Sequence, residues 1–147
     1  GAAVNPVHWC NGSSGVGSFL YRLYARTGEK RFLVAAEEAA RAVMTTRWKV
    51  GNAYCHGLAG NGDFLIDLAQ VTGDEKFLRW SRSIAHLLWA RRVNWNGAVM
   101  LPDETGEAVT GGYGAGSSGH LSFLVRLRDG GARLFHPYPT AGHDRPS

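Results

Sequence analysis

A glycine-rich segment that occurs three times constrains the fold of this chain more than any other feature. Residues 12–23 read GSSGVGSFLYRL, residues 57–68 read GLAGNGDFLIDL, and residues 116–127 read GSSGHLSFLVRL. The first and second copies lie 45 residues apart, and the third follows the second after 59, so a longer connection precedes it. Periods in this range usually indicate stacked two-helix units, because one unit alone cannot bury its apolar face.

Each copy is predicted to begin a helical hairpin. Apolar residues of the first copy recur at intervals of three and four and share one helical face: Val16, Phe19, Leu20, Leu23 and Tyr24. Gly28 is a C-terminal stop signal, and residues 29–46, rich in alanine, form the second helix. The second copy repeats this plan around Gly73, and its partner helix is marked by Phe77, Trp80, Ile84, Leu87 and Leu88. The fold class is therefore all-α, with the glycine loops of successive hairpins at the same end.

The connection before the third copy has no helical period. Residues 93–101 and 107–109 flank residues 102–106, which have turn chemistry, and we expect an excursion on the loop face that contains a short hairpin of strands. The third copy provides one helix, at about residues 118–128, and no partner helix follows it. A helix without its mate leaves an apolar face uncovered. We therefore expect this chain to be a piece of a longer protein, and to associate through its exposed edges when isolated.

The chain has two cysteines, and both occupy the same position of the repeat. They lie in Trp9-Cys10-Asn11-Gly12 and Tyr54-Cys55-His56-Gly57, whereas the third copy has Gly114 there. Two thiols and an imidazole are typical of catalytic zinc, which keeps its fourth position open for water or substrate. A disulfide is the alternative, but the repeat, the adjacent His56 and the lack of a secretory signal favour zinc. A fourth protein ligand, or no metal, would favour a structural role.

These motifs, followed by residues 112–119 (GYGAGSSG), resemble the C-terminal half of the lanthionine synthetase C-like family, from about residue 8 to residue 127. The resemblance implies that residues 1–135 form part of an α/α toroid of inner and outer helices, with a polar tail at residues 136–147. It implies that Cys10, Cys55 and His56 hold Zn²⁺. It also implies an enzyme that adds a cysteine thiol across dehydroalanine or dehydrobutyrine in a ribosomally made peptide, closing a (methyl)lanthionine thioether ring.

The same resemblance implies a dehydrated precursor peptide as the partner, and in some members kinase and lyase domains before the cyclase domain. The family places its proton-transfer histidine and acidic residue earlier in the chain, and no segment here matches them. The catalytic residues are therefore left unassigned, and we expect little turnover from this piece alone. Two alternatives stay open: a zinc protein that joins glutathione to dehydrated residues, and a non-catalytic helical-repeat fragment in which the ion only links two hairpins.

Three further residues are candidates for the site. His8 and His120 could support the ligands or carry a proton, and Tyr113 could line the site, although such residues are more often surface or packing groups. The remaining histidines are predicted to be structural or solvated: His86, His136 and His143. The tryptophans outside the ligand motif are predicted to pack rather than to form a substrate platform: Trp48, Trp80, Trp89 and Trp95.

Composition excludes several classes of protein. The net charge is +4, with 16 Lys and Arg against 12 Asp and Glu, and the basic residues are scattered. No nucleic-acid partner is expected, because the sequence contains no RNA-binding aromatic motif or recognition helix, although a modest attraction for an acidic peptide remains. No apolar run approaches the ~20 residues of a membrane span, and no signal peptide is visible. A cytoplasmic location is therefore expected.

Overall fold

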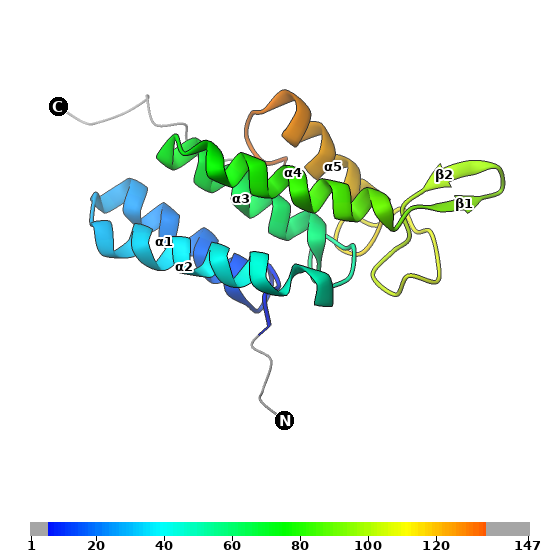
Figure 1. The fold of residues 1–147 in the computed structure, drawn as a ribbon, viewed down its shortest axis with the longest axis horizontal. Coiled ribbons are helices and arrows are strands. Elements are labelled where there is room, and N and C mark those ends of the chain that lie inside the picture. Colours follow the sequence, from blue (N-terminus) through cyan, green and yellow to red (C-terminus); the bar gives the residue numbers. More distant parts are fainter. Residues whose placement is uncertain (1–5, 135–147) are drawn as a thin grey trace.

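The computed structural model describes residues 6–134, and these residues fold mainly as helices (Figure 1). The elements in chain order are α1 (Ser13–Thr27), α2 (Lys30–Thr46), the 3₁₀ turn η1 (Arg47–Lys49), α3 (Leu58–Thr72), α4 (Glu75–Ala90), β1 (Val93–Trp95), β2 (Ala98–Met100) and α5 (Ser117–Asp129). The predicted all-α class is confirmed. The expected boundary after residue 135, the polar tail, His136 and His143 lie outside the described residues. No described helix combines the length and the apolar character needed to cross a bilayer.

The helices form an inner and an outer layer (Figure 1). Helix α1 pairs with α2 and α3 pairs with α4, while α3 lies between α1 and α5 and contacts both. Every residue of α3 from Leu58 to Ala69 is buried. Three inner helices side by side, with outer helices packed behind them, make an arc of the predicted α/α toroid. The second hairpin is thus the centre of the core, and α1 and α5 are the edges of the arc.

The glycine that precedes each inner helix is required by a close backbone contact. A Cβ atom at Gly12 would lie 2.4 Å from the carbonyl oxygen of Pro6, and one at Gly57 would lie 2.3 Å from that of Gly51. The same carbonyl oxygens accept hydrogen bonds from the next amides, those of Ser13 (3.1 Å) and Leu58 (2.9 Å). The third loop repeats this arrangement at Gly116. The loop therefore folds tightly back onto the helix start, and only glycine leaves space for it.

A second glycine determines how the inner helices approach one another. The ring of Phe64 on α3 lies against Gly17 of α1, where a Cβ atom would be 2.3 Å from it. Phe123 on α5 makes the same contact with Gly62 on α3, again at 2.3 Å. The equivalent phenylalanine of α1, Phe19, is 61% exposed. Helices α3 and α5 thus each insert one aromatic ring into a gap on the inner helix before them. The ring of Phe19 on α1 has no such neighbour among the described residues.

The exposed faces of α1 and α5 correct one expectation and confirm another. Val16 and Phe19, predicted to belong to the packing face of the first helix, are 56% and 61% exposed. The buried side of α1 is formed instead by small residues and one tyrosine: Ser14, Gly17, Ser18 and Tyr21. On α5, Leu121 is 59% exposed and Val125 is 47% exposed, so within residues 6–134 the third inner helix leaves an apolar face uncovered, as predicted.

The excursion contains the expected strand hairpin, but its turn lies elsewhere. Strands β1 and β2 pair antiparallel, with Val93 opposite Met100, and the turn is Asn96-Gly97, where φ is 51° and 82°. Asn-Gly between two short strands is a strong hairpin signal, because both residues tolerate positive φ. The segment from Pro102 to Gly106, predicted to be the hairpin turn, forms a separate turn closed by the side chain of Asp103, which accepts from the amide of Thr105 (3.0 Å).

The prediction that the four tryptophans serve packing is wrong for three of them. Trp48, Trp89 and Trp95 are 61%, 53% and 47% exposed. The guanidinium groups of Arg47 and Arg92 stack on Trp48 and Trp89, at 4.5 and 4.8 Å from the ring centres. The fourth, Trp80, packs against the core as predicted. The three exposed rings follow or end outer helices, or lie in the hairpin, where no second layer covers them.

Candidate metal centre

The three glycine loops lie side by side at one end of the inner helices. The amide of Trp9 in the first loop donates to the carbonyl oxygen of Cys55 in the second loop (3.1 Å). The amide of Cys55 in turn donates to the carbonyl oxygen of Gly114 in the third loop (2.8 Å). Because consecutive loops are hydrogen-bonded to each other, residues 45 positions apart in the sequence come together.

This arrangement brings the three predicted ligands together. One donor atom from each of Cys10, Cys55 and His56 lies within 4.8 Å of the others. His56 Nε2 is 3.8 Å from Cys55 Sγ. Both cysteines are free thiols rather than a disulfide, and Cys10 and His56 are exposed. Between residues 6 and 134, no fourth Cys, His, Asp or Glu joins the group. The cluster is thus a three-donor set that opens to solvent.

The donor set fits a zinc ion. Tetrahedral zinc with bonds of about 2.0–2.3 Å places its ligand atoms roughly 3.3–3.8 Å apart, so a small closure of this cluster is sufficient. Thiolate sulfur and imidazole nitrogen are ligands that zinc prefers. Without a cation, burial raises the pKa of the Cys55 thiol to about 11, and the neighbouring Cys10 thiol and the Glu104 carboxylate add to the shift. A bound dication reverses this balance, because it stabilises thiolate directly.

Two polar side chains contact the ligands from outside the set. Glu104 Oε2 is 3.1 Å from His56 Nδ1, the ring nitrogen opposite the one near Cys55. Asn11 accepts from the Cys10 thiol at 3.5 Å and lies 3.3 Å from His8 Nδ1. The ring of His8 meets that of His56 edge-on, with centres 5.4 Å apart. The structure therefore places His8 beside the cluster, where it could support the ligands.

The other candidate residues do not reach the open side of the cluster. His120 is fully buried in α5, and burial lowers its pKa, so its ring is neutral and sealed from solvent. Tyr113 is half-buried, its ring packs 4.8 Å from that of Tyr54, and its hydroxyl lies 3.3 Å from Ser122 Oγ. It belongs to the packing of the loops. His86 is exposed on α4, as predicted.

A comparison with known families shows which family the chain belongs to. The family described as lanthionine synthetase C-like protein matches residues 2–139 of the chain. The chain belongs to the lanthionine synthetase C-like family. A search of curated proteins finds no match. Membership agrees with the fold, since the match spans both hairpins and α5, and with the resemblance carried by the two ligand motifs.

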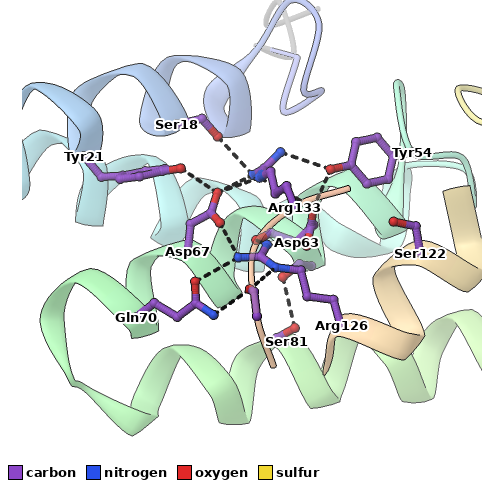
Figure 2. A network of polar contacts seen from close by, with 12 residues as sticks. Ser18, Tyr21, Tyr54, Asp63, Asp67, Gln70, Ser81, Ser122, Arg126 and Arg133 are labelled. Atoms are coloured by element: carbon purple, nitrogen blue, oxygen red, sulfur yellow. Dashed lines mark hydrogen bonds and ion pairs between the residues drawn. The ribbon is translucent and has the colours of Figure 1, made fainter. Parts of the chain in front are cut away.

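A buried ion network lies behind the ligand loops of this lanthionine synthetase C-like chain (Figure 2). Arg126 on α5 donates to Asp63 (2.5 Å) and Asp67 (2.6 Å) on α3. Arg133, which follows α5, donates to Asp67 at 2.6–2.7 Å and to the hydroxyl of Tyr54 at 3.1 Å. The four charged side chains are each 5% exposed or less. Two carboxylates and two guanidinium groups thus neutralise each other inside the protein.

The network reaches both edges of the arc. Tyr21 on α1 donates to Asp67 at 2.7 Å, and burial together with the Asp67 carboxylate raises its pKa to about 12. Burial alone would lower the pKa of the Arg126 guanidinium. The carboxylates of Asp67 and Asp63 together have the larger effect, so the pKa is raised. Tyr54, which also donates to Asp63, directly precedes the ligand Cys55. The network therefore fixes the backbone next to one ligand.

Neither the repeat nor the motifs predicted the network or Glu104. The Asp63 and Asp67 carboxylates both pair with arginine here. The two aspartates lie one helical turn apart on a helix that otherwise consists mainly of small and apolar residues. This pattern indicates a buried ionic partner. Glu104 lies in the excursion that does not repeat, so the alignment of the three copies carries no signal for it.

Proposed function

We propose that this chain is the zinc-binding part of a lanthionine synthetase-type cyclase. Membership of the family supports a cyclase of this kind at the family level. The observation that carries the finer proposal is the cluster of Cys10, Cys55 and His56, whose donor atoms lie within 4.8 Å of one another on an exposed face. Three donors and an open side are the arrangement of a zinc site that accepts a substrate ligand.

The proposed reaction is the addition of a peptide cysteine thiol to dehydroalanine or dehydrobutyrine. The sulfur forms a bond to the β-carbon, the double bond becomes a single bond, and the α-carbon gains one proton in place of the thiol proton. No atom enters or leaves, and the product is the (methyl)lanthionine thioether. A free cysteine thiol has a pKa near 8.5, so little thiolate is present at neutral pH. Zinc, when bound, supplies the positive charge that converts the substrate thiol into a thiolate.

The residues of this chain would hold the ion and leave room for the thiol. Cys10 and Cys55 contribute two negative charges when coordinated, so a third thiolate makes the site electron-rich and keeps the incoming sulfur nucleophilic. The α-carbon must then be protonated, and His8 is an imidazole that lies beside the cluster, against the ring of His56. We assign it no catalytic role, and the expectation stands that this piece alone turns over poorly.

The proposed partner is a dehydrated precursor peptide, with kinase and lyase domains as further partners where the protein is longer. The proposed location is the cytoplasm.

Cobalt substitution tests the proposal without requiring turnover. Co²⁺ takes similar tetrahedral ligands and absorbs visible light, so its spectrum responds to the number of coordinated thiolates. We expect the cobalt-loaded chain to change its spectrum when a short peptide with one cysteine is added, and not when the matched serine peptide is added. A stronger response to glutathione than to the cysteine peptide would favour glutathione as the thiol. No response to any thiol would contradict the proposal and leave the ion as a structural link between two hairpins.

A further inference from the structure

The excursion before the third unit brings a carboxylate to the ligand histidine. Its backbone is attached to both neighbouring loops: the amide of Glu104 donates to the carbonyl oxygen of Ala115 (3.1 Å), and the side chain of Asn52 donates to the carbonyl oxygen of Pro102 (3.3 Å). The carbonyl oxygen of Glu104 approaches Gly51 so closely that a Cβ atom there would be 3.0 Å away. Glu104 therefore starts from a fixed backbone position between the second and third loops.

The local turn adds to this fixation. The carboxylate of Asp103 accepts from the amide (3.0 Å) and from the hydroxyl (2.6 Å) of Thr105, and the amide of Asp103 donates to the carbonyl oxygen of Ala108 (2.7 Å). These hydrogen bonds also lower the pKa of Asp103, with the Thr105 side chain as the main cause, so it stays charged. Glu104 projects from the middle of this turn toward His56.

The two ring nitrogens of His56 face different partners. Nδ1 lies 3.1 Å from Glu104 Oε2, and Nε2 lies 3.8 Å from Cys55 Sγ. A carboxylate only accepts hydrogen bonds, so the contact requires a proton on Nδ1. With that proton in place, the neutral ring has its lone pair on Nε2, which is the nitrogen beside the thiols. Only this tautomer serves both contacts.

We propose that Glu104 is a positioning residue, which holds His56 in the ring orientation and tautomer that present Nε2 to the metal. The proposal rests on the proposed zinc site. A carboxylate that accepts from the second nitrogen of a ligand histidine raises the basicity of the ligand, and its loss typically costs 10- to 100-fold in metal affinity. The alternative is an ordinary surface ion pair, since the two side chains are 47% and 42% exposed, and such pairs contribute little.

Zinc affinity separates these two roles. The experiment is a competition titration of the full chain with zinc against a chromophoric chelator, for the unchanged chain, Glu104→Ala and the control Glu107→Ala. Glu107 lies in the same exposed excursion and carries the same charge, so the control removes one negative charge without removing the contact to His56. We expect Glu104→Ala to weaken zinc binding about 10- to 100-fold and Glu107→Ala to change it less than about twofold. Glu104→Asp should recover part of the loss.

A second readout does not involve the metal. The ¹⁵N chemical shifts of the His56 ring in the metal-free chain report the tautomer. We expect the Nδ1-protonated form in the unchanged chain and a mixture of both tautomers in Glu104→Ala.

The outcomes distinguish this proposal from the proposed function. If the unchanged chain binds one zinc ion and Glu104→Ala binds it equally well, the positioning role is wrong and the zinc site stands. If the two substitutions weaken binding equally, the effect is one of net charge and the positioning role is again wrong. If the unchanged chain binds no zinc, both proposals fail.

Discussion

Two groups of polar side chains, one buried between the inner helices and one in the loops that precede them, differ in how their charges are satisfied. The ion network of Asp63, Asp67, Arg126 and Arg133 is buried and contains equal numbers of positive and negative groups. The ligand cluster of Cys10, Cys55 and His56 lies on an exposed face, and the surroundings of Cys55 favour its protonated thiol. The network contains its own countercharges, whereas thiolates in the cluster need an added cation to stabilise them. Burial with internal pairing thus indicates a structural group, whereas thiol and imidazole donors gathered on an exposed face indicate a metal-binding site.

The two groups are joined at one residue. Tyr54 contacts Asp63 and Arg133 of the network through its hydroxyl, and its backbone continues into Cys55. Damage to the network should therefore affect both the fold and the site. Damage to the cluster should affect metal binding alone.

The largest expected effect comes from breaking the network. Arg126→Met removes one of the two buried cations and leaves the Asp63 and Asp67 carboxylates with too little positive charge, which typically costs about 3–5 kcal/mol. Urea unfolding followed by circular dichroism measures the loss. The control is Arg128→Met on the same helix, whose side chain is exposed and should leave the urea midpoint unchanged. Equal losses in the two variants would mean that the network is no more structural than a surface pair.

A smaller effect is expected at the junction between the two groups. Tyr54→Phe removes the hydroxyl that donates to Asp63 and accepts from Arg133, and leaves these buried groups each one partner short. The expected cost is about 1–3 kcal/mol in urea unfolding. Because the hydroxyl holds the loop that carries Cys55, zinc affinity should fall as well. Tyr113→Phe loses a half-buried contact to Ser122 and leaves the ion network intact, so its midpoint should shift less. Equal shifts of the urea midpoint in the two variants would contradict the role of the Tyr54 hydroxyl at the junction.

The cluster should respond to pH through the Cys55 thiol. Its pKa is raised to about 11, so the metal-free thiol keeps its proton at neutral pH and zinc must displace it. Apparent zinc affinity should therefore rise by at least about tenfold per pH unit between roughly pH 6.5 and 8.5, and level off only as the pH approaches the pKa. Competition titrations at several pH values measure this slope. An affinity that does not depend on pH would exclude a thiolate ligand.

The smallest effect is expected when the cluster is altered in the absence of metal. Cys10→Ser removes an exposed thiol whose contacts, to Asn11 and to the Cys55 thiol, are weak, so the metal-free chain should keep its urea midpoint. With zinc present, the unchanged chain should be stabilised by binding and the variant should not. A large destabilisation without metal would show that the cluster is part of the core.

The sequence predicted the fold well where the chain repeats. The glycine loops located three inner helices and their common end, because each loop needs glycine at the same backbone contacts, as at Gly12 and Gly57. The same alignment paired Cys10 with Cys55, which the structure brings together.

The sequence predicted less where the determinants are not local. Periodicity found an apolar face on α1 but could not show that the chain leaves Val16 and Phe19 uncovered. The network depends on Arg126 and Arg133, whose partners on α3 are about sixty residues earlier, and no spacing rule connects them. Glu104 reaches His56 only through the folded turn around Asp103, so its role was visible only in three dimensions.

Elemental analysis of the purified chain for zinc tests the central claim most directly, with Cys10→Ala, Cys55→Ala and His56→Ala measured in parallel. The account predicts one zinc ion per chain, retained in Arg128→Met as an unrelated control and lost or strongly depleted in all three ligand variants while their helical circular dichroism is unchanged. Zinc that persists in the ligand variants, or a folded unchanged chain that takes up none, would contradict the assignment of Cys10, Cys55 and His56 as a metal centre.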